Sequence, residues 1–208
     1  EMCIRDSTTT LLTTLSEDYI KENKDKPFCL YIAHAAPHSP MQGPHEKAIR
    51  TEATPEGDKN SDRSNKEIYK DMVEELDWSV GRILETLKKY KLDENTFVVF
   101  FSDNGPVINN GGSAGGYKGA KGSPWEGGHR VPGICYMPGT IKEGTTCEQT
   151  VMSFDLFPTM LDMADIHYND SKKKLDGTSL VPLFKGENLA PRLLFWGNGN
   201  KTISVRDG

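Results

Sequence analysis

A run of five apolar residues, FVVFF at 97–101, stops abruptly at the polar sequence SDNGP. Short apolar runs rich in β-branched and aromatic residues are typical of strands that are buried on both faces of a sheet. Two similar runs occur elsewhere, at 27–33 and 131–137. Three stretches have the periodicity of amphipathic helices, at 10–23, 66–90 and 153–166. This alternation predicts an α/β fold with a mostly parallel sheet flanked by helices.

Composition and charge exclude several classes of function. The net charge is -5 over 208 residues, so nothing indicates a basic surface for nucleic acid. No apolar run approaches the roughly 20 residues that a membrane span requires. The four cysteines are scattered without a Cys-x-x-Cys pair, which argues against zinc. We expect Cys29 and Cys135 to pack as small hydrophobic residues.

Polar side chains follow two of the predicted strands. Asp103 and Asn104 come directly after 97–101, and His34 and His38 come just after 27–33. In α/β sheets, ligands gather beyond the carboxyl ends of the strands, so these groups are expected to converge. The Asp103 carboxylate and the Asn104 amide oxygen suit Ca²⁺ or Mg²⁺. The alternative is an ordinary turn, because Asp-Asn-Gly is a favoured turn sequence.

Two loops carry further candidates for chemistry. His38 lies between prolines in APHSP, where a fixed imidazole is able to donate to an anion or act as an acid. The alternative is a histidine in a surface loop. Lys118 and Lys121 lie among glycines beside Trp125, which suits close approach to an oxyanion. A flexible solvated loop is the alternative there. A long polar loop is predicted from residue 41 to residue 65.

Three separated blocks of the sequence resemble the sulfatase family of the alkaline-phosphatase-like superfamily. They are PFCLYIAHAAPHSP, FFSDNGP and KGAKGSPWEGGHRVPGI, in that order, and SFDLFPTMLDMADI followed by LDGTSLVPLF adds a fourth. The resemblance extends from about residue 10 to residue 195. We therefore predict a partial sulfatase catalytic domain at 10–208, preceded by a junction at 1–9 that is foreign to the family.

The resemblance implies roles for five residues. By their places in the motifs, Asp103 and Asn104 would ligate an active-site Ca²⁺, and Lys121 would contact the sulfate group. His38 would contact the sulfate or the leaving oxygen, and Lys118 occupies a position near the site. Glu126 and Arg130 also match recurring positions, where we expect a structural ion pair. Trp125 and Tyr117 are able to stack on a sugar or aryl ring, but we expect them to pack in the core or in the loop.

The resemblance also implies a formylglycine nucleophile, which the family makes from Cys or Ser in Cys/Ser-x-Pro-Ser-Arg. That motif does not occur in the 208 residues. We therefore expect a fragment that is incomplete at both ends, binds Ca²⁺ weakly and has no turnover alone. In the parent protein, formylglycine would attack the ester while Lys121 and His38 stabilise the sulfuryl oxygens.

The implied substrate is a small sulfate ester or a sulfated glycan, and the implied location is outside the cytoplasm: periplasmic, lysosomal or extracellular. Two alternatives stay open. The first is a phosphodiesterase or phosphonate hydrolase of the same superfamily. The second is a non-catalytic protein that keeps an anion pocket.

Overall fold

The computed structural model describes residues 7–46, 62–169, 173–197 and 203–207. The chain divides into two compact units. Unit 1 comprises residues 1–96 and 106–115, and unit 2 comprises residues 97–105 and 116–208. His38 therefore belongs to unit 1, whereas Asp103 and the lysine loop belong to unit 2.

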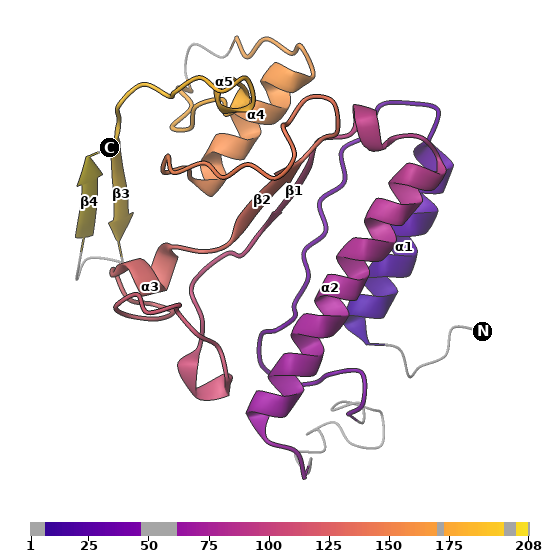
Figure 1. Ribbon diagram of the computed structural model, residues 1–208, viewed down its shortest axis with the longest axis vertical. Helices are drawn as coiled ribbons and strands as arrows, with labels where there is room; N and C mark the ends of the chain where they lie inside the picture. Colours follow the sequence, from indigo (N-terminus) through magenta and orange to yellow (C-terminus); the bar gives the residue numbers. More distant parts are fainter. Residues whose placement is uncertain (1–6, 47–61, 170–172, 198–202, 208) are drawn as a thin grey trace. The chain divides into compact units, whose positions relative to one another are not determined.

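Unit 1 is built on two long helices, α1 (Thr8–Asn23) and α2 (Asn65–Lys89), which lie side by side (Figure 1). They confirm the helices predicted at 10–23 and 66–90. Their buried large apolar side chains are Ile20, Ile68, Met72 and Leu87. Two short 3₁₀ turns also belong to unit 1, at Asp93–Asn95 and Ile108–Asn110.

The two helices are also joined by polar side chains. These contacts include Thr10 and Glu75 at 2.9 Å, Thr13 and Ser79 at 2.6 Å, and Glu17 and Arg82 at 2.8 Å. The residue numbers of the partners in α2 rise together with those in α1, so the two helices run in the same direction. Thr13 and Ser79 are almost wholly buried. Their mutual hydrogen bond removes the cost of burying two unpaired hydroxyl groups.

The strand predicted at 27–33 is not formed, and this prediction was wrong. The segment has no strand partner among the described residues. An apolar run is buried only where neighbouring strands or helices cover it, and here Tyr31 is 81% exposed. Cys29 is exposed as well, so its predicted packing was also wrong. Most of the predicted loop at 41–65 lies outside the described residues, which stop at 46 and resume at 62.

Unit 2 contains two antiparallel strand pairs. Strand β1 (Val98–Phe101) pairs with β2 (Gly133–Tyr136), so that Val98 lies opposite Tyr136. Strand β3 (Leu193–Gly197) pairs with β4 (Ile203–Asp207). The predicted strands at 97–101 and 131–137 are thus present, but the pairs described here are not parallel. The segment between β1 and β2 lacks the long crossover helix of a parallel pair.

The described residues of unit 2 also form three short helices. They are α3 (Glu126–His129), α4 (Leu156–Met163) and α5 (Val181–Phe184). A 3₁₀ turn, Ser153–Asp155, leads directly into α4, so the helix predicted at 153–166 is present in a shorter form. Within the described residues, no helix is both long enough and apolar enough to cross a membrane.

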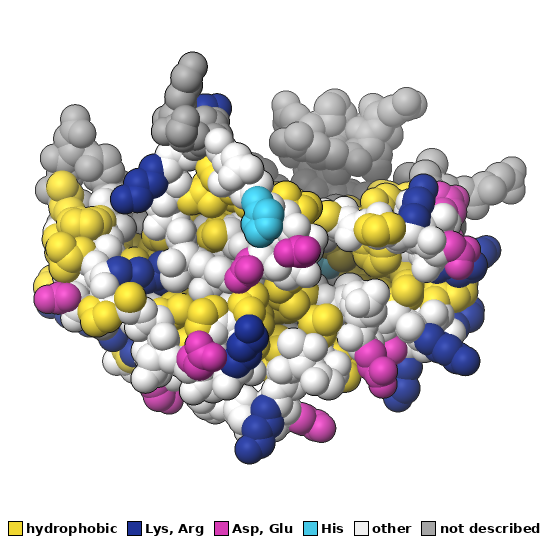
Figure 2. Space-filling view, turned by 90° about the horizontal axis from the view of Figure 1, so that it is seen from above, with side chains coloured by type: hydrophobic (Ala, Val, Ile, Leu, Met, Phe, Trp, Pro, Cys, Tyr) yellow, Lys and Arg dark blue, Asp and Glu magenta, His cyan; other side chains and the backbone are white. Residues whose placement is uncertain are grey.

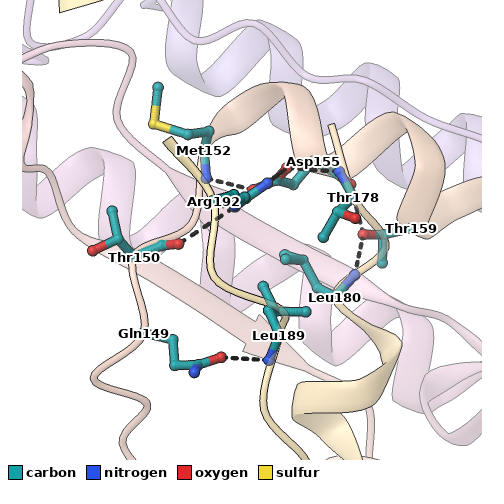
Figure 3. Close-up of polar contacts among 9 residues, drawn as sticks. All are labelled: Gln149, Thr150, Met152, Asp155, Thr159, Thr178, Leu180, Leu189 and Arg192. Carbon is teal, nitrogen blue, oxygen red and sulfur yellow. Dashed lines mark hydrogen bonds and ion pairs between the residues drawn. The ribbon is translucent and has the colours of Figure 1, made fainter. Parts of the chain in front are cut away.

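A buried ion pair fixes the segment that leads into β3 (Figure 3). Asp155 is fully buried and binds Arg192 through both carboxylate oxygens. The same carboxylate accepts hydrogen bonds from the backbone N–H groups of Met152 at 2.7 Å and Thr178 at 2.9 Å. Because Arg192 directly precedes β3, this network anchors the base of the β3–β4 ribbon to the start of α4.

The β3–β4 ribbon has two different faces. Its register places Leu194, Trp196, Ser204 and Arg206 on one face, and these side chains are buried or half-buried. The opposite face carries four exposed apolar side chains: Leu193, Phe195, Ile203 and Val205. Hydrophobic side chains accordingly gather at the left edge of Figure 2, where the ribbon lies in Figure 1.

Candidate functional site

The end of β1 presents the first two candidate residues. The N–H of Ser102 bonds the carbonyl of Pro132 at 3.4 Å, which continues the pairing of β1 and β2 by one residue. Asp103 follows and is exposed, and Asn104 is half-exposed. The Asn104 amide nitrogen donates to the Asp103 carboxylate, and the Ser102 hydroxyl donates to the Asn104 carbonyl at 3.0 Å. Two oxygen-bearing side chains thus lie side by side at a strand end.

Gly105 then turns the chain under α3. Its N–H donates to the carbonyl of Gly128 at 2.9 Å, and the residue is buried. A Cβ added at Gly105 would lie 2.0 Å from the carbonyl oxygen of Gly127, so only glycine fits. Close packing against α3 therefore requires glycine at position 105, in addition to the turn that Asp-Asn-Gly favours.

The lysine loop contains a tight turn at residues 120–123. The N–H of Ser123 bonds the carbonyl of Ala120 at 2.9 Å, and Gly122 has a φ of +82°. A positive φ at the third residue is the geometry of a type II turn, which favours glycine there. Lys121 occupies the second position of this turn and is exposed. Its backbone is therefore held by defined hydrogen bonds.

Two cations of this loop lie over aromatic rings. The Lys118 ammonium lies 3.7 Å from the centroid of the Trp125 ring, and Arg130 lies 4.6 Å from that of Tyr117. Both contacts are within the range of cation–π attraction. Each aromatic ring thus contacts a cation of its own loop, while both rings remain exposed. Glu126 also pairs with Arg130 at 3.2 Å, which confirms the predicted ion pair.

Helix α3 connects the lysine loop to the end of β1. The N–H of Gly127 donates to the carbonyl of Lys118 at 2.8 Å, and Gly128 accepts from Gly105. A Cβ at Gly127 would lie 2.3 Å from the carbonyl oxygen of Gly119. The sequence EGG thus lets three backbone segments meet closely, and it links the loop that carries Lys121 to the strand end that carries Asp103.

The two candidate histidines, His34 and His38, lie in unit 1. His38 is exposed, and its backbone N–H bonds the carbonyl of Ala35 at 2.8 Å. Its Nδ1 lies 2.7 Å from the carbonyl oxygen of Ser39. Because a carbonyl only accepts, Nδ1 carries a proton, and Nε2 is the atom that remains for a ligand. Asn110 donates to the Ser39 hydroxyl at 3.1 Å and so supports the same loop.

His34 is placed differently from His38. It is half-buried, and its Nε2 lies 3.5 Å from the Ser79 hydroxyl. Burial lowers the pKa of its imidazole, while the Glu75 carboxylate acts in the opposite direction. His34 thus contributes to the interior of unit 1. The convergence of His34 and His38 with the residues after β1 stays a prediction.

The side chains of Asp103 and Asn104 are of the type that binds a hard cation such as Ca²⁺. Both carry oxygen donors, and the backbone bond from Gly105 fixes the strand end that presents them. Within the described residues, no group of three or more His, Cys, Asp or Glu side chains converges as a metal site. The two residues therefore fit part of a Ca²⁺ ligand set.

Comparisons with known proteins identify the family. A match to the family described as Sulfatase covers residues 5–166. Human steryl-sulfatase is 32% identical over 191 residues, a match that covers 88% of this chain and 30% of that protein. The chain thus spans about a third of the length of the curated relatives that it matches.

Solved structures agree with this match. The structure of Ps i-CgsB in complex with k-i-k-neocarrahexaose has a TM-score of 0.79 and 31% identity, and covers 95% of this chain and 44% of that one. The PsFucS1 sulfatase from Pseudoalteromonas sp. has a TM-score of 0.76 and 25% identity, covering 96% and 39%. These likenesses confirm the α/β, alkaline-phosphatase-like fold class.

Proposed function

The chain belongs to the sulfatase family, and on that premise we propose that the gene product containing it hydrolyses sulfate esters. One observation carries the proposal beyond family membership. Helix α3 joins the loop that carries Lys121 to the strand end that carries Asp103 and Asn104. It does so through a backbone bond to Lys118 at 2.8 Å and one from Gly105 at 2.9 Å. An anion-binding cation and oxygen ligands for a metal are thereby held by one small structural element.

Lys121 is the proposed contact to the sulfate group. Its ammonium is a compact charge that stabilises sulfuryl oxygens as they gain negative charge. The turn at 120–123 fixes its backbone before substrate binds, so less reorganisation is needed in the transition state. Lys118 already contacts Trp125, so we assign it a supporting role near the sulfate.

His38 is the proposed partner of the leaving oxygen. The Ser39 carbonyl holds the proton on Nδ1, so the ring donates from Nε2 only when it is doubly protonated. In that state it is able to give a proton to the departing alcohol. In the neutral state Nε2 accepts a hydrogen bond instead. The proposed role therefore requires the imidazolium form.

Asp103 and Asn104 are the residues that would hold Ca²⁺. The bound ion would supply positive charge that neutralises the sulfate and orients the nucleophile. Two side chains give fewer oxygens than the roughly six to eight that Ca²⁺ prefers, so further ligands are part of the proposal. Formylglycine would supply the nucleophile.

We propose a sulfated carbohydrate or an aryl sulfate as substrate and an exported location for the protein. The likeness to a structure bound to k-i-k-neocarrahexaose supports the first substrate class, and the similarity to steryl-sulfatase supports a smaller ester.

The test uses the complete gene product that contains these residues. It is assayed with 4-nitrophenyl sulfate and, in parallel, with a phosphodiester of the same phenol. We expect sulfate-ester turnover, and we expect Lys121→Ala to lower kcat by about 100-fold or more, the usual effect of losing one group that stabilises developing negative charge. Lys142→Ala is the matched control, because Lys142 is another exposed loop lysine in unit 2.

Other outcomes would support the alternatives. Turnover of the phosphodiester alone would indicate a phosphodiesterase of the same superfamily. Binding of sulfate without turnover of either ester would indicate a non-catalytic anion-binding protein. We expect the 208 residues expressed alone to bind Ca²⁺ weakly and to show no turnover.

A further inference from the structure

The inner face of the β3–β4 ribbon lies against the segment that contains α3. The ring of Trp196 stacks on the ring of His129, with centroids 4.5 Å apart and planes at 22°. The Ser204 hydroxyl donates to the carbonyl of Pro124 at 2.9 Å. Arg206 reaches Glu126 at 3.4 Å. Three side chains of the ribbon therefore hold one stretch of six residues, 124–129.

This stretch is the same one that fixes the lysine turn. Gly127 binds the carbonyl of Lys118, and a Cβ at Gly128 would lie 2.1 Å from the carbonyl oxygen of Ser123. Lys118 and Ser123 bracket Lys121. A displacement of α3 is therefore passed to the loop on both sides of Lys121, because α3 is in close backbone contact with Lys118 and with Ser123.

From these contacts we propose that Arg206, together with Trp196 and Ser204, is a positioning residue for Lys121 and acts through α3. The inference rests on the proposed function, because it requires Lys121 to contact the sulfate group. None of the three ribbon residues needs to touch the substrate. Their effect is to set where the lysine turn lies.

Burial and charge favour positioning over a stabilising role for Arg206. The side chains of Arg206 and Glu126 are 39% and 37% exposed, and ion pairs in contact with water contribute little to stability. Glu126 also binds Arg130, so it is held between two guanidinium groups on different elements. Among the described residues, loss of Arg206 leaves Glu126 its ion pair with Arg130 and removes one of the three contacts that align α3 with the ribbon.

The base of the ribbon is anchored independently. Arg192 binds the buried Asp155 immediately before β3 begins. This anchor is in a different part of unit 2 from the 124–129 contacts and does not involve the lysine loop. The ribbon is therefore a fixed support against which α3 is aligned.

The experiment measures hydrolysis of 4-nitrophenyl sulfate by the complete gene product. We expect Arg206→Met, combined with Ser204→Ala, to lower kcat/KM about tenfold, since a shift of about 1 Å in a positioned group costs up to about 100-fold. Arg206→Lys should restore part of the activity because it keeps the charge. Val205→Thr is the matched control, because Val205 lies on the outer face of the same strand.

A double-mutant cycle separates positioning from a general structural effect. In a Lys121→Ala background, the Arg206→Met and Ser204→Ala changes should cause no further loss, because the group that they position is absent. The same tenfold loss in both backgrounds would overturn the inference. So would an unchanged kcat/KM in the variant that retains Lys121.

A second readout keeps the inference testable if the wild type does not hydrolyse the ester, an outcome that would refute the proposed function. Acetylation of Lys121 by acetic anhydride is then followed by peptide mass spectrometry with and without inorganic sulfate. Sulfate should slow acetylation in the wild type and slow it less in the Arg206→Met, Ser204→Ala variant. Equal protection of both proteins, or no protection of the wild type, would overturn the inference.

Discussion

Asp155→Ala is the substitution with the largest stability effect that we expect in unit 2. The Asp155 side chain is fully buried and accepts four hydrogen bonds: two from Arg192, one from the Met152 N–H and one from the Thr178 N–H (Figure 3). Removing the carboxylate leaves a guanidinium and two backbone N–H groups without their acceptor. The Thr150 carbonyl, at 3.4 Å from Arg192, replaces little of this.

The expected loss follows from the burial of the pair. Breaking a buried ion pair by removing one partner costs about 3–5 kcal/mol. The Arg192 side chain is 20% exposed, so water partly solvates the remaining charge, and we expect about 3 kcal/mol. With a urea m-value of about 2 kcal/mol per molar, the midpoint of unfolding should fall by about 1.5 M.

The assay is urea unfolding followed by both circular dichroism and tryptophan fluorescence. The two transitions must coincide before a free energy is taken from them, since the chain has two compact units. Asp162→Ala is the matched control: Asp162 is on α4 and is exposed, and it accepts one bond from Ser179 at 2.6 Å. That change should stay within about 0.5 kcal/mol.

A double variant tests the physical cause. In Asp155→Ala/Arg192→Met the uncompensated charge is gone, so the loss should be smaller than the sum of the two single losses by more than about 1 kcal/mol. The reasoning is refuted if Asp155→Ala unfolds at the same urea concentration as Asp162→Ala. Strict additivity in the double variant would show that the two side chains are not coupled.

Two further predictions concern unit 1. Ser64→Ala removes the capping box that Ser64 forms with Glu67, so urea unfolding should show a loss of about 1 kcal/mol, and Ser64→Asp should restore most of it. Burial lowers the pKa of His34, so its imidazole loses a proton on folding. The contribution of His34 to the free energy of unfolding is fully present above the ordinary pKa of about 6.5, and it declines as the pH falls below that value. Unfolding at pH about 5 and about 8 should therefore show a smaller pH dependence for His34→Gln than for the wild type, whereas His167→Gln, at an exposed position, should behave as the wild type.

The periodicity of apolar residues predicted the helices, because a helix forms from residues that are close together in the sequence. The stretch at 66–90 has a long apolar stripe, and the structure has a helix at Asn65–Lys89. The run at 27–33 has strand composition, yet composition does not say whether a partner strand is available. The orientation of β1 and β2 was likewise not readable, because it depends on the path of the 31 residues between them.

In the candidate site, too, the sequence predicts what depends on neighbouring residues and does not predict contacts between distant segments. Asp103, Asn104 and Lys121 are candidates because each stands in a compact motif beside glycines. The structure explains two of these glycines, Gly105 and Gly127, by contacts that leave no room for a Cβ. Whether His38 joins them depends on the relation between units, which no local motif specifies. Its role remains part of the proposal.

The contacts of the β3–β4 ribbon with residues 124–129 were not predicted, because they join segments that are far apart in the sequence. Ser204 meets Pro124, and Arg206 meets Glu126, across 80 residues of chain. The alternation in ISVRD predicts that Ser204 and Arg206 share a face, because strand side chains have a period of two. It does not identify what covers that face. Motifs therefore point to candidate residues for chemistry, whereas the contacts between distant segments that support those residues are found only from the packing.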